Sequence, residues 1–170
     1  MGIRVPPGAL FYFVPMDDHT LWMKYALQEA QKAYSKGEVP VGAIIVYENK
    51  IIGKGHNLVE TLQDPTAHAE LLAITAAANA LASWRLEDST LYSTLEPCAM
   101  CAGAILLARI PCLVYAAEDP RFGACGSVVN IAQNDKFDVK IQIVRGIHAS
   151  ESLTLLKDFF SSIRERNDTF

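Results

Sequence analysis

Two cysteines three positions apart follow a proline in the segment TLEPCAMCAGA, residues 94–104. Proline is favoured at the start of a helix, and residues three apart lie on one helix face, so Cys98 and Cys101 are expected to face one point. The positive end of the helix dipole favours thiolates there. This pair is suited to zinc but does not complete a zinc site, and two buried cysteines in a core helix are the alternative interpretation.

A further ligand is expected in the segment DPTAHAE, residues 64–70, where another helix starts. His68 would add an imidazole, and Glu70 would leave a free carboxylate beside the metal. Three protein ligands leave the fourth zinc position open to water, as in catalytic sites, and zinc lowers the pKa of that water to roughly 7. Positions i and i+2 of an ideal helix point nearly opposite ways, so His68 and Glu70 converge only in an irregular first turn.

Helices and strands must bring these motifs together. Hydrophobic periodicity and turn residues predict helices at residues 20–36, 67–82, 97–109 and 150–166, and strands at 43–47, 51–55, 90–94, 112–117 and 140–146. Asp17 and Asp18 are the expected N-caps of the first helix. The alternating order predicts an α/β protein with three layers, α/β/α, around a central mixed five-stranded sheet.

Length and composition narrow the class of protein. The chain has 170 residues, of which 51% are hydrophobic, so we expect an N-terminal extension at residues 1–15 and a single domain at residues 16–170. Four cysteines are too few for a disulfide scaffold, and no apolar run approaches the ~20 residues of a membrane span, so a cytoplasmic protein is expected. The net charge of −4 argues against a surface that binds nucleic acid throughout.

The HAE and PCxMC segments resemble the zinc-dependent nucleoside and nucleobase deaminases, for which they are a known signature. Within that superfamily, the chain resembles the bacterial tRNA-specific adenosine deaminases (the TadA family) over residues 19–164. The matching segments include EVPVGAIIV, GKGHN, DPRFGACGS and LKDFF. Many deaminases share the first two motifs, whereas the DPRFGACGS loop and the final Phe-Phe pair are particular to this family.

The resemblance implies a cytidine deaminase-like fold with one zinc ion per subunit, held by His68, Cys98 and Cys101, and with Glu70 as the proton shuttle. The implied reaction is the hydrolytic deamination of adenosine to inosine at the wobble position of a tRNA with a tRNA-Arg type anticodon. A zinc-activated hydroxide would attack C6 of adenine. The implied partners are the tRNA anticodon stem-loop and a second copy of the chain in a homodimer; no DNA is expected.

The resemblance also implies residues that hold the RNA. Asn57 matches an asparagine that binds the flipped base, although a turn residue at a strand end is the alternative. The peptide at Ala69 would contact the base, and Asp119 falls where the family contacts the ribose. The other implied RNA contacts are phosphate contacts from Arg121 and Arg164 and an aromatic pair, one ring toward RNA and one in the core, of Phe159 and Phe160.

Two other functions stay open at this point. A free nucleobase deaminase, for guanine or cytosine, would share HAE and PCxMC but would not need the DPRFGACGS loop or the Phe-Phe pair. A non-catalytic, zinc-stabilised RNA-binding subunit could dispense with Glu70 and would need a fourth protein ligand, such as Cys125.

Overall fold

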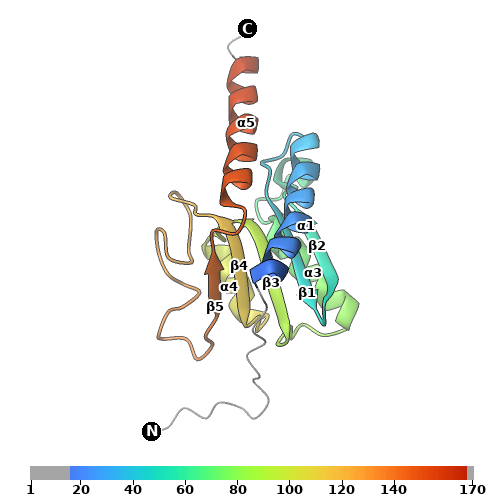
Figure 1. Cartoon of the computed structure of the whole chain (residues 1–170), viewed down its shortest axis with the longest axis vertical. Helices are drawn as coiled ribbons and strands as arrows, with labels where there is room; N and C mark the ends of the chain where they lie inside the picture. The colour runs from blue at the N-terminus through green and yellow to red at the C-terminus, as the bar shows by residue number, and fades with distance from the viewer. Residues whose placement is uncertain (1–15, 168–170) are drawn as a thin grey trace.

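A five-stranded sheet forms the centre of the computed structural model, which describes residues 16–167; the expected extension at residues 1–15 lies outside the described residues. The strand order is β2-β1-β3-β4-β5 (Figure 1). The strands are β1 (Gly42–Tyr47), β2 (Lys50–His56), β3 (Ser89–Leu95), β4 (Cys112–Ala117) and β5 (Gln142–Arg145). β1 pairs antiparallel with β2 and β3, while β3, β4 and β5 run parallel. The predicted mixed five-stranded sheet is confirmed.

Helices cover both faces of this sheet. They are α1 (Met16–Ser35), α2 (Val59–Leu62), α3 (Ala69–Leu81), α4 (Ala99–Leu107) and α5 (Ala149–Asn167). Alternate residues of β1 serve opposite faces, as the pleat of a strand requires: Ala43 and Ile45 join α3 and α4, whereas Ile44 and Val46 join α1. The three-layer prediction is therefore confirmed. Within residues 16–167, none of the helices is both long and apolar enough to span a bilayer.

Glycines let α3 approach the sheet very closely. A Cβ atom on Gly53 would lie 2.3 Å from the backbone oxygen of Ala73, and one on Gly55 would lie 2.2 Å from that of Ala69. The helix face above these glycines carries only small side chains, and Ala69, Ala73 and Ala77 are fully buried there. The missing side chains allow backbone-to-backbone packing, which sets the depth of the first turn of α3.

Local structure refines the sequence prediction at several points. In the described residues α1 covers Met16–Ser35, so Asp17 and Asp18 lie within the helix and are not its N-caps. The β1–β2 hairpin turns on Glu48 and Asn49, whose φ values of 47° and 56° fit the two-residue type I′ turn. The four-residue helix α2 was not predicted, because one turn is too short to show a periodic pattern.

Candidate active site

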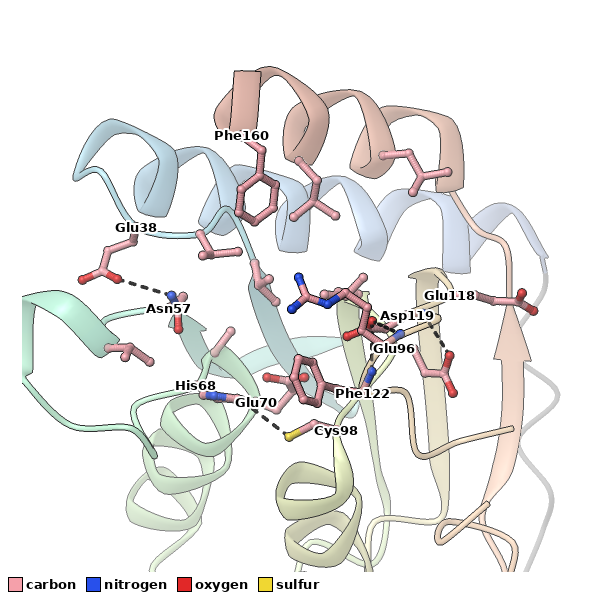
Figure 2. Close-up of a pocket in the computed structure, with 18 of the residues that line it drawn as sticks. Glu38, Asn57, His68, Glu70, Glu96, Cys98, Glu118, Asp119, Phe122 and Phe160 are labelled. Carbon is pink, nitrogen blue, oxygen red and sulfur yellow. Dashed lines mark hydrogen bonds between the residues drawn. The ribbon is translucent and has the colours of Figure 1, made fainter. Parts of the chain in front are cut away.

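The first turn of α3 carries His68 and Glu70. His68 is the N-cap residue, with extended backbone angles of φ −78° and ψ 150°, and Glu70 is the second helical residue. Because an N-cap residue has not yet entered the helix, the opposed directions of positions i and i+2 do not apply to this pair. Figure 2 shows both side chains beside Cys98. The required convergence is therefore present.

The start of α4 carries the two cysteines. Cys98 is the N-cap residue, with φ −72° and ψ 176°, and Cys101 is the third helical residue. Pro97 therefore precedes the helix instead of opening it, and the predicted start at residue 97 was two residues too early. Both sulfur atoms still lie at the N-terminal end of α4, where the helix dipole favours negative charge.

The three expected ligand atoms lie at distances that suit a metal ion. His68 Nδ1 is 3.7 Å from Cys98 Sγ and 3.5 Å from Cys101 Sγ. In a tetrahedral zinc site, bonds of roughly 2.0 and 2.3 Å place nitrogen and sulfur ligands about 3.5 Å apart. Among residues 16–167, no fourth His, Cys, Asp or Glu belongs to this group, and Cys125 Sγ instead lies 3.9 Å from the Pro97 carbonyl oxygen. The donor set fits zinc with one position free.

The surrounding charges prepare the site for proton transfer. A hydrogen bond from Cys101 and a second one from His68 outweigh burial and lower the pKa of Cys98 to about 3. Glu70 is only 4% exposed, and burial raises its pKa. The Ser93 hydroxyl donates a hydrogen bond to Glu70 Oε1 at 3.4 Å. A carboxyl group with a raised pKa is suited to taking up a proton and releasing it again.

A cavity of about 650 Å³ opens above these groups. Figure 2 shows α5 on the side of the cavity opposite the starts of α3 and α4. Of the residues expected to contact substrate or metal, those that line the cavity are Asn57, His68, Ala69, Glu70, Cys98, Asp119, Arg121 and Phe160. Cys101 is buried beneath them.

Two expected RNA-binding residues lie outside the cavity wall. Phe159 is 3% exposed and packs edge-on against Tyr34, with ring centroids 5.8 Å apart. Arg164 is exposed, and its Nη2 donates to Ser161 Oγ at 3.3 Å. Of the aromatic pair, it is therefore Phe160 that faces the cavity, while Phe159 joins α5 to α1.

Glu38 supports one wall of the cavity from below. This carboxylate is 1% exposed and accepts hydrogen bonds from Asn57 Nδ2 at 3.3 Å, from the Glu60 amide at 3.2 Å and from the Thr61 amide at 2.6 Å. Burial raises its pKa, but these hydrogen bonds, with Thr61 foremost, bring the pKa below its ordinary value. Because Asn57 gives one N–H to Glu38, its amide oxygen and second N–H stay available for a ligand.

Glu96 organises the loop that forms another wall. Its carboxylate, 2% exposed, accepts backbone N–H groups from Asp119 at 3.1 Å, Cys125 at 2.9 Å and Ser127 at 3.1 Å, and also accepts the Ser127 hydroxyl. Burial raises the pKa of Glu96, and these hydrogen bonds outweigh it, so the pKa lies below its ordinary value. The loop thus folds around one buried negative charge.

Sequence reasoning missed these supports and part of the lining. Glu38 and Glu96 act through partners more than 18 residues away in the chain, and spacing carries no such signal. Phe122, Leu153 and Leu156 also line the cavity. For the leucines a signal existed, since Leu153, Leu156 and Phe160 recur at helical spacing along one face of α5.

The profile of the MafB19-like deaminase family matches residues 17–164, so the chain is a deaminase. The buried carboxylate beside the His-Cys-Cys group agrees with that class. The tRNA-specific adenosine deaminase of Bacillus subtilis (strain 168) is 46% identical over 151 residues, which span 89% of this chain and 94% of that protein. The chain belongs to the family of tRNA-specific adenosine deaminases.

Solved structures agree with this placement. A structure from work on A-to-I editing by tRNA:A34 deaminases at the wobble position is 42% identical, covers 81% of this chain and 99% of that chain, and has a TM-score of 0.77. A guanine deaminase from Bacillus subtilis is 44% identical but covers only 59% of this chain and 64% of that one, with a TM-score of 0.56. The expected cytidine deaminase-like fold is confirmed.

Proposed function

We propose that the protein deaminates adenosine to inosine at the wobble position of a tRNA with a tRNA-Arg type anticodon. The observation that carries this proposal is the convergence of His68, Cys98 and Cys101 beside Glu70 at the floor of the cavity. The relatives support the choice of substrate, because both the Bacillus subtilis protein and the similar structure are described as tRNA adenosine deaminases. A tRNA substrate and the bacterial relatives support a cytoplasmic location.

His68, Cys98 and Cys101 would hold one zinc ion per chain. When bound, zinc supplies a water that is a nucleophile at neutral pH. Glu70 takes one proton of the attacking water and delivers it to N1 of adenine. It then moves the second proton, from the new hydroxyl on C6, to the amine, so that the C6–N bond breaks and ammonia leaves. Ser93 holds the Glu70 carboxyl in place for both transfers.

Residues of the cavity wall would orient the nucleotide. Asn57, held by Glu38, offers an amide oxygen and an N–H to the edge of the base. The peptide at Ala69 lies at the same depth, between His68 and Glu70. Asp119 would contact the ribose, and the remaining proposed contacts, to phosphates and to a neighbouring base, are Arg121, Arg164 and Phe160, with Phe159 supporting Phe160 from behind.

We further propose that two copies of the chain associate through the outer face of α4. No charged residue occurs in Ala99–Leu107, and Leu107 is 76% exposed at the end of that helix. An apolar patch on one helix can meet the same patch on a second copy across a two-fold axis. Sedimentation should report a dimer for the wild type and a monomer for Leu107→Glu; a wild-type monomer at micromolar concentration would remove this proposal.

A guanine deaminase is the second candidate, because a Bacillus subtilis guanine deaminase is 44% identical over the part of the chain that it matches. The decisive experiment offers the purified, zinc-loaded protein an anticodon stem-loop with adenosine at the wobble position, beside free guanine, cytosine and adenosine. Inosine formation in the RNA alone supports the proposal. Turnover of free guanine with the RNA unchanged would select the second candidate. A stem-loop with a non-arginine anticodon and adenosine at the same position tests the tRNA-Arg assignment.

A further inference from the structure

Phe122 is a large apolar side chain that the loop after β4 holds in solvent. It is 64% exposed and lines the cavity (Figure 2). An exposed phenylalanine does not by itself indicate a binding site, because apolar atoms make up much of any protein surface. Two features distinguish Phe122: its backbone is fixed by hydrogen bonds, and its side chain lies beside the reaction site.

Hydrogen bonds fix the backbone on both sides of the ring. The Asp119 carboxylate accepts the backbone N–H of Arg121 at 2.9 Å and of Phe122 at 3.2 Å, and the Gly123 N–H donates to the Asp119 carbonyl at 3.0 Å. The buried Glu96 holds the Asp119 N–H in turn. The turn therefore presents Phe122 in one direction without further ordering on binding.

The same turn is joined to the metal-ligand helix. Gly123 forms an antiparallel β-bridge with Cys98, and the Ala124 N–H donates to the Pro97 carbonyl at 2.9 Å. A Cβ atom on Gly123 would lie 2.5 Å from a Glu96 carboxylate oxygen, so a larger residue could not pack there. Phe122 thus stands one residue from the backbone that is paired with Cys98.

The ring is arranged for stacking. The guanidinium carbon of Arg121 lies 5.4 Å from the centroid of the Phe122 ring, so a cation covers part of the phenyl group while most of it stays open. Bases of single-stranded nucleic acid stack on such rings whatever their sequence, and a guanidinium beside the ring can meet the phosphate of the stacked nucleotide. A free base or nucleoside offers no second ring for this surface.

We propose that Phe122 and Arg121 form a stacking subsite for the base of a nucleotide next to the deaminated adenosine. This inference rests on the proposed function and adds a requirement to it: the substrate must carry an unpaired neighbouring base. The target base enters the enclosed floor beside Glu70, while its neighbour stays at the open mouth on Phe122. Phe122 is then a specificity residue that acts on binding of the strand and not on the chemical step.

Kinetics on the anticodon stem-loop test this subsite. Phe122→Leu keeps an apolar side chain but removes the aromatic face, and Phe122→Trp restores it. Since a base–aromatic stack is worth about 1–3 kcal/mol, Phe122→Leu should raise KM about tenfold with kcat unchanged, and Phe122→Trp should match the wild type. Phe137→Leu, at an exposed phenylalanine outside the cavity lining, is the matched control and should change neither constant.

An abasic nucleotide separates stacking from a structural role. RNAs with an abasic site on the 5′ or the 3′ side of the target are compared with the intact stem-loop. On one of these two RNAs, the KM of the wild type should rise about tenfold, to the value of Phe122→Leu. The same abasic site should not raise the KM of Phe122→Leu any further. A Phe122→Leu effect that persists on both abasic RNAs, or that is absent on the intact RNA, overturns the subsite.

A binding measurement keeps the test independent of turnover. 2-Aminopurine at each neighbouring position reports stacking through quenching of its fluorescence. Quenching at one position by the wild type, lost with Phe122→Leu and kept with Phe137→Leu, supports the subsite even if the reaction assigned to the floor is wrong. Absence of quenching at both positions overturns the subsite even if the RNA is deaminated, so the two proposals fail separately.

Discussion

The floor and the rim of the cavity are built by different means. The floor consists of His68, Glu70, Cys98 and Cys101, all placed by the first turns of two helices. The rim around Asp119 and Phe122 has no regular structure and takes its shape from the buried Glu96, 23 residues earlier in the chain than Asp119. Local helix geometry therefore sets the reacting groups, and long-range hydrogen bonds to buried carboxylates set the surfaces that meet the substrate. Substitutions in the two regions should differ in kind as well as in size.

The largest effect is expected at the floor, from removal of a metal ligand. Cys101→Ser should lower the zinc content from about one ion per chain to a small fraction and abolish deamination, because two ligands do not hold zinc in competition with water. Cys112→Ser, at a half-buried thiol outside the ligand group, is the matched control and should keep zinc and activity. Metal analysis beside the activity assay checks both; full zinc content in Cys101→Ser would contradict the ligand assignment.

Glu70→Gln should separate chemistry from metal binding. The amide keeps the shape of the carboxyl group but cannot take up the proton, so kcat should fall by about 10²–10⁴ while the zinc content stays at the wild-type level. Steady-state kinetics of inosine formation give kcat, a single-turnover experiment gives the rate constant of the chemical step, and binding of the stem-loop should change little. A loss smaller than tenfold would mean that another group moves the proton.

Glu96→Gln tests whether the rim depends on one buried charge. The NH2 group of the glutamine side chain would face a backbone N–H group of the loop, and two donors cannot form a hydrogen bond. We therefore expect the free energy of unfolding to fall by about 2 kcal/mol. KM for the stem-loop should rise severalfold with kcat nearly unchanged, the reverse of the pattern at Glu70. Glu87→Gln, at an exposed ion pair with Arg85, is the control for stability and should stay within about 0.5 kcal/mol of the wild type. A fall in kcat alone would contradict the division into floor and rim.

The smallest expected effect is the pH dependence of the support under Asn57. Glu38→Gln should cost about 2 kcal/mol at pH 7. The pKa of Glu38 in the folded protein lies below the ordinary value of 4.5, so its contribution is fully present above pH 4.5 and is lost as the pH falls through the lowered pKa. Urea unfolding of the wild type and the variant from pH 7 to pH 3.5 should therefore show a difference that narrows below pH 4.5. A constant difference would mean that Glu38 contributes by packing and not by charge.

The sequence predicted the floor of the cavity better than its rim. Spacing alone predicted that Cys98 and Cys101 converge, because residues three apart share one helix face. For His68 and Glu70 spacing was not enough, and the extended N-cap conformation of His68 brings them together. The starts of α3 and α4 were each predicted two residues too early, because His68 and Cys98 are N-cap residues that precede their helices. The succession of helices and strands along the chain also predicted the mixed sheet, but not the order of its strands.

Spacing could not predict the rim. The contacts of Glu96 with Asp119, Cys125 and Ser127 depend on β3 and β4 lying side by side, which only the folded sheet establishes. The same limit applies to the aromatic pair in α5, for which the sequence did not indicate which ring is buried. Phe159 and Phe160 are adjacent in sequence, and the packing against Tyr34 decides which of them turns inward.

Gly55 links the sheet to the reaction site, since a Cβ atom there would lie 2.2 Å from the carbonyl oxygen of Ala69, the residue between His68 and Glu70. No residue larger than glycine therefore fits at this position, and we expect laboratory evolution to keep the glycine. In a library that randomises every residue and selects for editing, alleles at Gly55 should disappear as fast as those at His68, although a glycine hydrogen touches no substrate. A map of tolerated substitutions would mark it as part of the catalytic centre.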